Sequence, residues 1–263
     1  MSRTYISRDH LRNNEKNRKT FSIHPLVEYL DSYIHHDTVT KCDLKSKITQ
    51  IYDQGQIGSC TANAVCQSMR MCPKYANFFP SRLYVYAKER ITEGQKTLED
   101  TGADAEDGLV QIRDHGVCTE TSWPYNPDNA NVIPPASCDQ EASNYKVHSI
   151  GRICSDYATR QSKINSIKKS IIAGIPILIG IEVYESFESQ DVANTGVVPM
   201  PDPKEQCVGG HEILLVGFDD ETQRFCFVNS WGPDWGDHGY GYLTYDFVTS
   251  PNYTTEFIMI TSA

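Results

Sequence analysis

A cysteine at the start of an expected helix is the first residue that could do chemistry. Cys60 follows a turn-rich loop with Gly55 and Gly58, and residues 60–75 are mostly compatible with a helix. Unpaired amide groups at a helix N-terminus favour an anion and so lower the pKa of a thiol. Free cysteines are also among the most buried residues. The loop alone therefore leaves a nucleophile and a structural cysteine as equal alternatives.

Two later polar residues favour the nucleophile. His211 stands at the head of an apolar run typical of a buried strand, and Asn229 ends another run that begins at Phe225. Each residue taken alone is more often structural than catalytic. A cysteine followed at a distance by a histidine and then an asparagine is, however, a known order for thiol proteases. The three residues together therefore predict a catalytic site.

The chain resembles the papain-like C1 cysteine proteases, including the cathepsins, from about Asp43 to the C-terminus. The resemblance rests on three motifs that occur in the family's order. These motifs are Gln54 with Gly58-Ser59-Cys60, then Gly210-His211, then Asn229-Ser230-Trp231-Gly232 with Trp235-Gly236.

The resemblance implies a thiolate–imidazolium pair and no metal or other cofactor. Cys60 attacks the peptide carbonyl, and His211 protonates the departing amine and then activates the water that hydrolyses the thioester. Asn229 accepts the second ring proton of His211, and Trp231 shields that contact from water. Gln54 donates a side-chain N–H to the oxyanion, and losing such a donor typically costs roughly 3–4 kcal/mol.

The resemblance also implies where the substrate binds. Gly102 and Ala103 stand where the family has a glycine pair whose backbone binds substrate as an extra strand, and Gly210 and Trp231 complete the expected substrate-binding positions. Glu212 stands where the family usually has a small residue in the pocket for the second residue before the scissile bond. A carboxylate there predicts a preference for arginine, because a guanidinium pairs with it bidentately. Neutralisation of Glu212 by a nearby Arg or Lys of the protein is the alternative.

Hydrophobic patterns predict helices in the first half of the chain and strands in the second. Helices are expected at 60–75, 82–89, 109–113 and 163–173, and strands at 175–183, 213–218, 224–229, 240–245 and 256–261. With the resemblance, this order predicts an α+β, two-lobed papain-like fold. The N-terminal lobe, at about 43–140, would be helical, and the C-terminal lobe, at about 141–263, would be antiparallel and β-barrel-like. The active site would lie in the cleft between the two lobes.

The N-terminal residues differ from the rest in charge. Residues 1–20 carry a net charge of +4, whereas the remaining chain carries −14. We expect residues 1–37 to be an N-terminal extension or short pro-segment and residues 38–263 to be the papain-like catalytic domain. The basic segment is either a solvated, flexible terminus or an inhibitor that lies on an acidic cleft of its own enzyme.

Composition limits the partners and the location of the protein. The net charge of −10 argues against nucleic acid, and no apolar run is long enough to cross a membrane. We expect a monomer that acts on polypeptide substrates. The first thirty residues have no signal-peptide core, and the nine cysteines lack the dense spacing of a disulfide framework. A cytoplasmic or otherwise intracellular location is therefore expected.

The sequence thus predicts a cysteine endopeptidase, with two alternatives. A papain-fold transferase would pass an acyl group from Cys60 to an amine, and the Gly102 landmark favours hydrolysis over that reaction. A catalytically inactive peptide-binding relative is disfavoured because all four catalytic positions are intact. The cathepsin B branch closes its cleft with an inserted loop that carries two histidines. The corresponding segment here, residues 126–144, is short and contains no histidine. Endopeptidase action is therefore expected.

Overall fold

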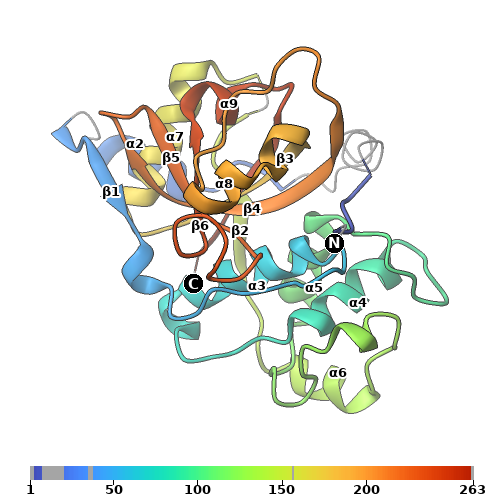
Figure 1. Cartoon of the computed structure of the whole chain (residues 1–263). Coiled ribbons are helices and arrows are strands. Elements are labelled where there is room, and N and C mark those ends of the chain that lie inside the picture. The colour runs from blue at the N-terminus through green and yellow to red at the C-terminus, as the bar shows by residue number, and fades with distance from the viewer. Residues whose placement is uncertain (1–2, 8–20, 35–37, 156, 262–263) are drawn as a thin grey trace.

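The computed structural model describes residues 3–7, 21–34, 38–155 and 157–261, and these form two lobes (Figure 1). The rest of the expected N-terminal segment, at 1–2, 8–20 and 35–37, lies outside the described residues. No helix in the described ranges has the length and apolar character needed to cross a membrane.

One lobe is helical, as the sequence predicts. Its helices are α3 (Cys60–Met71), α4 (Arg82–Thr92), α5 (Ala105–Asp114) and α6 (Ala136–Ala142), with 3-10 turns at Pro73–Tyr75 and Pro127–Asn129. Helix α3 is buried along its whole length and packs against both α4 and the sheet of the other lobe. It ends at Met71, earlier than predicted, because Cys72 precedes a proline and takes an extended conformation.

The other lobe is built on one antiparallel sheet. Its strands are β1 (Lys41–Asp43), β2 (Ser149–Arg152), β3 (Ile177–Tyr184), β4 (Cys207–Asp219), β5 (Arg224–Val228), β6 (Tyr240–Thr244) and β7 (Thr254–Thr261). The order is β2-β7-β3-β4-β5-β6, and β1 pairs with β4. In the described part of the chain the two ends of this order do not pair, so the sheet does not close into a barrel.

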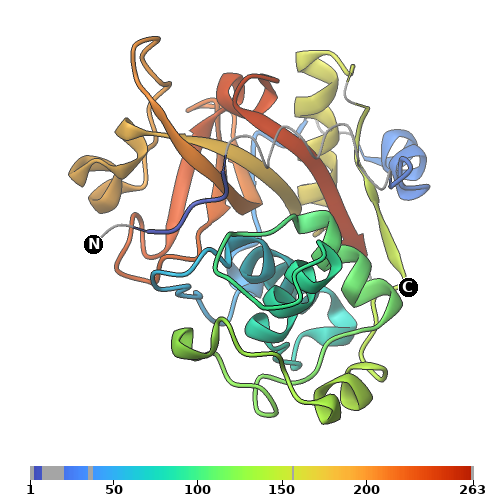
Figure 2. The ribbon, with the colours of Figure 1, turned by 90° about the vertical axis from the view of Figure 1, so that its right-hand side faces the viewer.

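Further helices belong to the lobe that holds the sheet. They are α2 (Leu26–Tyr33), α7 (Arg160–Ile172), α8 (Gln190–Thr195) and α9 (Tyr245–Thr249), with 3-10 turns at Lys45–Lys47 and Glu185–Glu188. Helix α7 packs against both α2 and α9. The chain therefore contributes α2 and β1 to the sheet lobe before it enters the helical lobe at α3 (Figures 1 and 2).

Candidate active site

The cysteine predicted as the nucleophile is the first residue of α3. Ser59 is the N-cap position, and its carbonyl accepts the first helical hydrogen bond from the Asn63 N–H. Cys60 therefore lies at the positive end of the helix dipole. Backbone hydrogen bonds from Glu212 and Thr61 also act on the sulfur and lower its pKa. Since Glu212 directly follows His211, these bonds place the thiol beside the strand that carries the histidine.

The predicted histidine and asparagine are in direct contact. His211 lies within β4, which begins earlier than predicted, and Asn229 is the first residue after β5. The two strands pair in register at Leu214 and Val228, which brings both side chains to the same edge of the cleft. The His211 Nε2–H donates to the Asn229 Oδ1 at 2.7 Å. The other ring nitrogen, Nδ1, is then the one left for Cys60.

Trp231 covers this contact, as expected. Its ring centroid lies 4.9 Å from that of His211, and its side chain is itself buried. Phe187 packs edge-on against the same indole, with ring centroids 5.4 Å apart. This apolar cover keeps water away from the imidazole–amide hydrogen bond.

Gln54 joins the two lobes at the site. Its side-chain N–H donates to the Ile57 carbonyl at 2.9 Å, and its amide oxygen accepts from the Ser230 hydroxyl at 2.6 Å. Its backbone N–H also donates to the Ser230 carbonyl at 2.8 Å. The amide is thus held in one orientation. Within the described residues, its second side-chain N–H makes no hydrogen bond.

A segment that the sequence could not position runs through the cleft. Residues 3–7, dark blue in Figures 1 and 2, pass between the two lobes. Ile6 and Gly210 exchange two backbone hydrogen bonds, of 3.2 and 2.7 Å, in an antiparallel bridge. Thr4 donates its N–H to the Gln56 carbonyl at 3.1 Å. The segment is therefore bound by main-chain contacts on both sides of Cys60.

Side chains of this segment cover the catalytic residues. The Arg3 guanidinium lies 4.1 Å from the Trp231 ring centroid, and the Tyr5 ring packs edge-on against the same indole. The Tyr5 hydroxyl donates to a Glu188 carboxylate oxygen at 2.6 Å. Cys60 and His211 are each only 1% exposed as a result of their position and this cover.

Burial favours the neutral forms of the catalytic pair in this covered state. Burial raises the pKa of the Cys60 thiol to about 12, although the Glu212 backbone N–H opposes the shift. Burial likewise lowers the pKa of His211 to about 4, against the hydrogen bond that His211 donates to Asn229, and the charge of Arg3 lowers it further. The covered site therefore does not favour the ion pair expected from the resemblance.

The predicted substrate-binding residues lie against the same segment. A side chain at Gly102 would come within 3.2 Å of the Ile6 Cα, and Gly102 has a positive φ of 76°. Ala103 is fully buried, and Gly210 is the backbone partner of Ile6. Gly102, Gly210 and Trp231 thus all contact the segment.

Glu212 faces another carboxyl group. Its pKa is raised well above the usual range by burial and then by Glu256, Asp104 and Glu89, and it forms a side-chain hydrogen bond with Glu256. Glu212 and Glu256 lie on β4 and β7, on either side of β3, where Gly180 opposite Glu212 has no side chain to separate them. Burial and the neighbouring carboxyl groups therefore favour the protonated form of Glu212.

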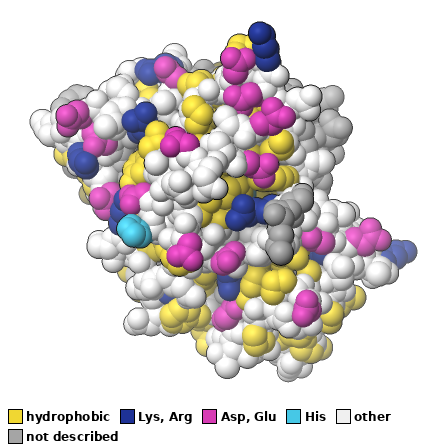
Figure 3. Space-filling view, viewed as in Figure 1, with side chains coloured by type: hydrophobic (Ala, Val, Ile, Leu, Met, Phe, Trp, Pro, Cys, Tyr) yellow, Lys and Arg dark blue, Asp and Glu magenta, His cyan; other side chains and the backbone are white. Residues whose placement is uncertain are grey.

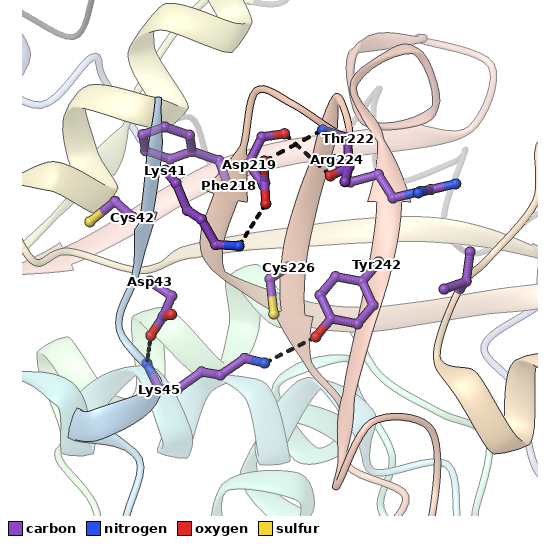
Figure 4. Close-up of a pocket in the computed structure, with 11 residues that line it drawn as sticks. Lys41, Cys42, Asp43, Lys45, Phe218, Asp219, Thr222, Arg224, Cys226 and Tyr242 are labelled. Atoms are coloured by element: carbon purple, nitrogen blue, oxygen red, sulfur yellow. Dashed lines mark hydrogen bonds and ion pairs between the residues drawn. The ribbon is translucent and has the colours of Figure 1, made fainter. Parts of the chain in front are cut away.

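The lobe that holds the sheet has a separate pocket, away from the predicted catalytic residues. It has a volume of about 390 Å³ and is formed by β1, β4, β5 and β6 (Figure 4). Lys41 pairs with Asp219 at its rim, and the Lys45 amine donates to the Tyr242 hydroxyl. None of the predicted site residues lines it, so it is not the substrate cleft.

Comparisons with known proteins identify the family. Residues 37–257 match the model of the papain family cysteine proteases. An uncharacterised peptidase C1-like protein of Acanthamoeba polyphaga mimivirus is 40% identical over 79% of this chain and 68% of its own length. The chain belongs to the papain family of cysteine proteases.

Two further relatives agree with the papain-family fold. Xylellain, a cysteine protease from Xylella fastidiosa, is 30% identical, and its structure superposes with a TM-score of 0.79 over 100% of this chain and 96% of that one. A digestive cysteine proteinase of Homarus americanus is 29% identical over 76% of this chain but only 60% of its own length. The two-lobed α+β prediction is thereby confirmed.

Proposed function

We propose that the chain is a cysteine endopeptidase whose own N-terminal segment inhibits it. The observation that carries the catalytic part is the 2.7 Å contact of His211 with Asn229 beneath Trp231, next to a cysteine at a helix start. We place the inhibitory part before Phe21, because Phe21 and α2, although within the expected segment 1–37, pack on the catalytic lobe. The enzyme acts as a monomer, and the nine cysteines, among which the described residues show no disulfide, support a reducing, intracellular location.

The geometry supports a defined path for the protons. Asn229 holds His211 through Nε2, so Nδ1 takes the proton of Cys60 and later gives it to the leaving amine. The thiolate attacks the peptide carbonyl, and the carbon–nitrogen bond breaks to leave a thioester on Cys60. His211 then takes a proton from water, which hydrolyses the thioester and regenerates the thiol.

Gln54 and the start of α3 stabilise the oxyanion. The Gln54 amide is fixed by Ile57 and Ser230, so its second N–H needs no rearrangement to bond the developing charge. The backbone N–H of Cys60 adds a donor at the positive end of the helix. Preorganised donors of this kind act in the transition state, where the carbonyl oxygen carries negative charge.

The inhibitory part rests on competition for the same backbone groups. Ile6 already uses both hydrogen-bonding groups of Gly210, and it packs on Gly102. A polypeptide substrate that binds there as an extra strand cannot do so while Ile6 is present. The segment must therefore leave the cleft before substrate enters, which makes the full chain a zymogen.

One digestion tests the reaction type. The chain is incubated with a long unstructured peptide, with and without the epoxide inhibitor E-64, and the products are identified by mass spectrometry. We expect internal cleavage that E-64 abolishes. Release of C-terminal dipeptides would contradict endopeptidase action, transfer of the acyl group to an added amine would indicate the transferase, and an unchanged peptide would indicate a binding protein.

Glu212 and Glu256 support a preference for arginine at the second residue before the scissile bond. An incoming guanidinium would face two carboxyl groups that are hydrogen-bonded to each other. We expect Arg to be favoured over Phe by about 1–3 kcal/mol, roughly five- to over a hundredfold in kcat/KM. Because the pKa of Glu212 is raised, its carboxyl group is uncharged below that pKa, and the preference should grow as pH rises through it.

Matched fluorogenic substrates measure this preference. Arg-Arg and Phe-Arg substrates are compared across pH on the wild type and on Glu212→Ala. We expect the Arg/Phe ratio to rise with pH in the wild type and to fall toward one in the variant. A wild type that favours Phe-Arg, or a variant with an unchanged ratio, would show that Glu212 has no such role.

A further inference from the structure

A small buried cavity lies between α3 and the strands that carry the catalytic residues. It is lined by Ala64 and Gln67 of α3, by Glu212 and Leu214 of β4, and by Asn229. Its volume is about 10 Å³, which is close to the space that one water molecule needs. The cavity therefore adjoins the asparagine that orients the catalytic histidine.

Three residues around this cavity have a buried polar atom without a hydrogen-bond partner in the described part of the chain. The atoms are Asn229 Nδ2, Gln67 Oε1 and Glu212 Oε1. The three side chains are 3%, 4% and 2% exposed, so bulk water does not reach them. An unsatisfied buried polar atom typically costs about 1–3 kcal/mol, and three around one cavity need a common explanation.

The chemistry of the three atoms is complementary. The Asn229 amide nitrogen can only donate, and the Gln67 amide oxygen can only accept. The Asn229 oxygen is already used, since it accepts from His211 at 2.7 Å and from the Ser230 N–H at 2.8 Å. A water that accepts from Nδ2 and donates to Gln67 and Glu212 would satisfy all three atoms.

We propose that one buried water links Asn229 Nδ2 to Gln67 Oε1, and that Gln67 is thereby a positioning residue for the catalytic asparagine. A rotation of the Asn229 amide by 180° would turn its N–H toward the Nε2–H of His211, which is repulsive. The water opposes this rotation because it holds the nitrogen on the cavity side. Gln67 thus keeps the acceptor oxygen on the imidazole without touching substrate.

The inference rests on the proposed protease activity, so the test has one arm that needs no activity. The first arm is a crystal structure of the full chain at a resolution that shows ordered water. We expect density for one water within hydrogen-bond distance of Asn229 Nδ2 and Gln67 Oε1. An empty cavity would overturn the proposal, and an inactive protein would leave this arm unaffected.

The second arm measures peptide hydrolysis by Gln67→Leu and Gln67→Glu in the full chain, so that the N-terminal segment affects all variants equally. Leucine keeps the shape but removes the acceptor, and we expect kcat to fall by about tenfold with KM little changed. Glutamate keeps an acceptor oxygen and should restore most of kcat. Equal loss in both variants, or wild-type kcat in Gln67→Leu, would overturn the positioning role.

A matched control separates positioning from stability. Gln111 in α5 is another buried glutamine, and its side-chain N–H donates to the Gly116 carbonyl at 3.0 Å. Gln111→Leu makes the same substitution away from the site, and should lower Tm without lowering kcat. A parallel loss of kcat in Gln111→Leu would mean that the effect of Gln67→Leu reflects general destabilisation.

Discussion

Replacing Cys60 with alanine should reduce peptide hydrolysis to below about one per cent of the wild-type rate while the fold is kept. Cys60 is the cysteine that lies at a helix start, and its sulfur is next to the backbone of the residue after His211. The alanine has no group that can form the thioester. The measurement is the initial rate on a fluorogenic dipeptide substrate, with circular dichroism to verify the fold.

Cys66 provides the matched control for this prediction. It lies on the same helix, is fully buried, and its pKa is raised well above the usual range by burial. A buried thiol of this kind is inert, so Cys66→Ala should keep activity within about threefold of the wild type. If Cys60→Ala keeps more than one per cent of the hydrolysis rate, and Cys66→Ala loses as much activity as Cys60→Ala, Cys60 is not the nucleophile.

The candidate catalytic residues could be chosen from the sequence because residue type and order point to them. Cys60, His211 and Asn229 occur in one diagnostic order, and each ends or begins a recognisable apolar or helical run. The resemblance points to Gln54, which precedes Cys60 by six residues. Such information is local in the sequence, and the sheet register then brings the pieces together. In the structure His211 contacts Asn229, and Gln54 bonds the neighbouring Ser230.

Contacts that depend on long-range pairing could not be predicted. Glu256 reaches Glu212 because β7 has a register shift at this point and because Glu256 and Phe257 take positive φ angles of 71° and 101°. Neither Glu nor Phe favours a positive φ, so the sequence does not predict this conformation. Strand β1 has only three residues, too few for a periodic pattern, and is defined by its pairing with β4.

Asp100 illustrates a substitution whose consequence needs the structure. The resemblance places Ile57 and Asp100 where the family usually has a disulfide pair. Here Asp100 instead accepts a hydrogen bond from the Gly58 N–H at 2.9 Å and another from the Tyr86 hydroxyl. The loop before Cys60 is thus still tied to the helical lobe, by bonds that do not require an oxidising environment.

Removing residues 1–20 should raise activity by about tenfold or more, equivalent to about 1.4 kcal/mol. The segment occupies backbone groups that substrate needs, and its basic residues are attracted to an acidic domain, over whose surface Asp and Glu side chains are spread (Figure 3). Salt screens that attraction, so the full chain should gain activity at high ionic strength and a chain that starts at Phe21 should not. Initial rates at low and high salt measure both effects.

The same removal should change how Cys60 reacts with pH. Alkylation by iodoacetamide requires the thiolate. Burial holds the pKa of Cys60 at about 12 in the covered site, so its alkylation in the full chain should accelerate only toward alkaline pH. Removing the segment readmits water to the site. It also takes away Arg3, whose charge lowers the pKa of His211 in the covered state. The pKa of the thiol should then fall, that of the imidazole should rise, and alkylation should become fast at lower pH.

A single substitution in the full chain separates displacement from truncation. Ile6 is 1% exposed against Gly102 and Gly210, so Ile6→Asp would bury a carboxylate and should expel the segment. Ile23 is 43% exposed in the same N-terminal stretch, and Ile23→Asp should leave inhibition intact. Ile6→Asp is therefore expected to approach the activity of the truncated chain, whereas Ile23→Asp stays at that of the full chain. Equal activity of the full-length and truncated chains at both salt concentrations would mean that the segment lies in the cleft without inhibiting the enzyme.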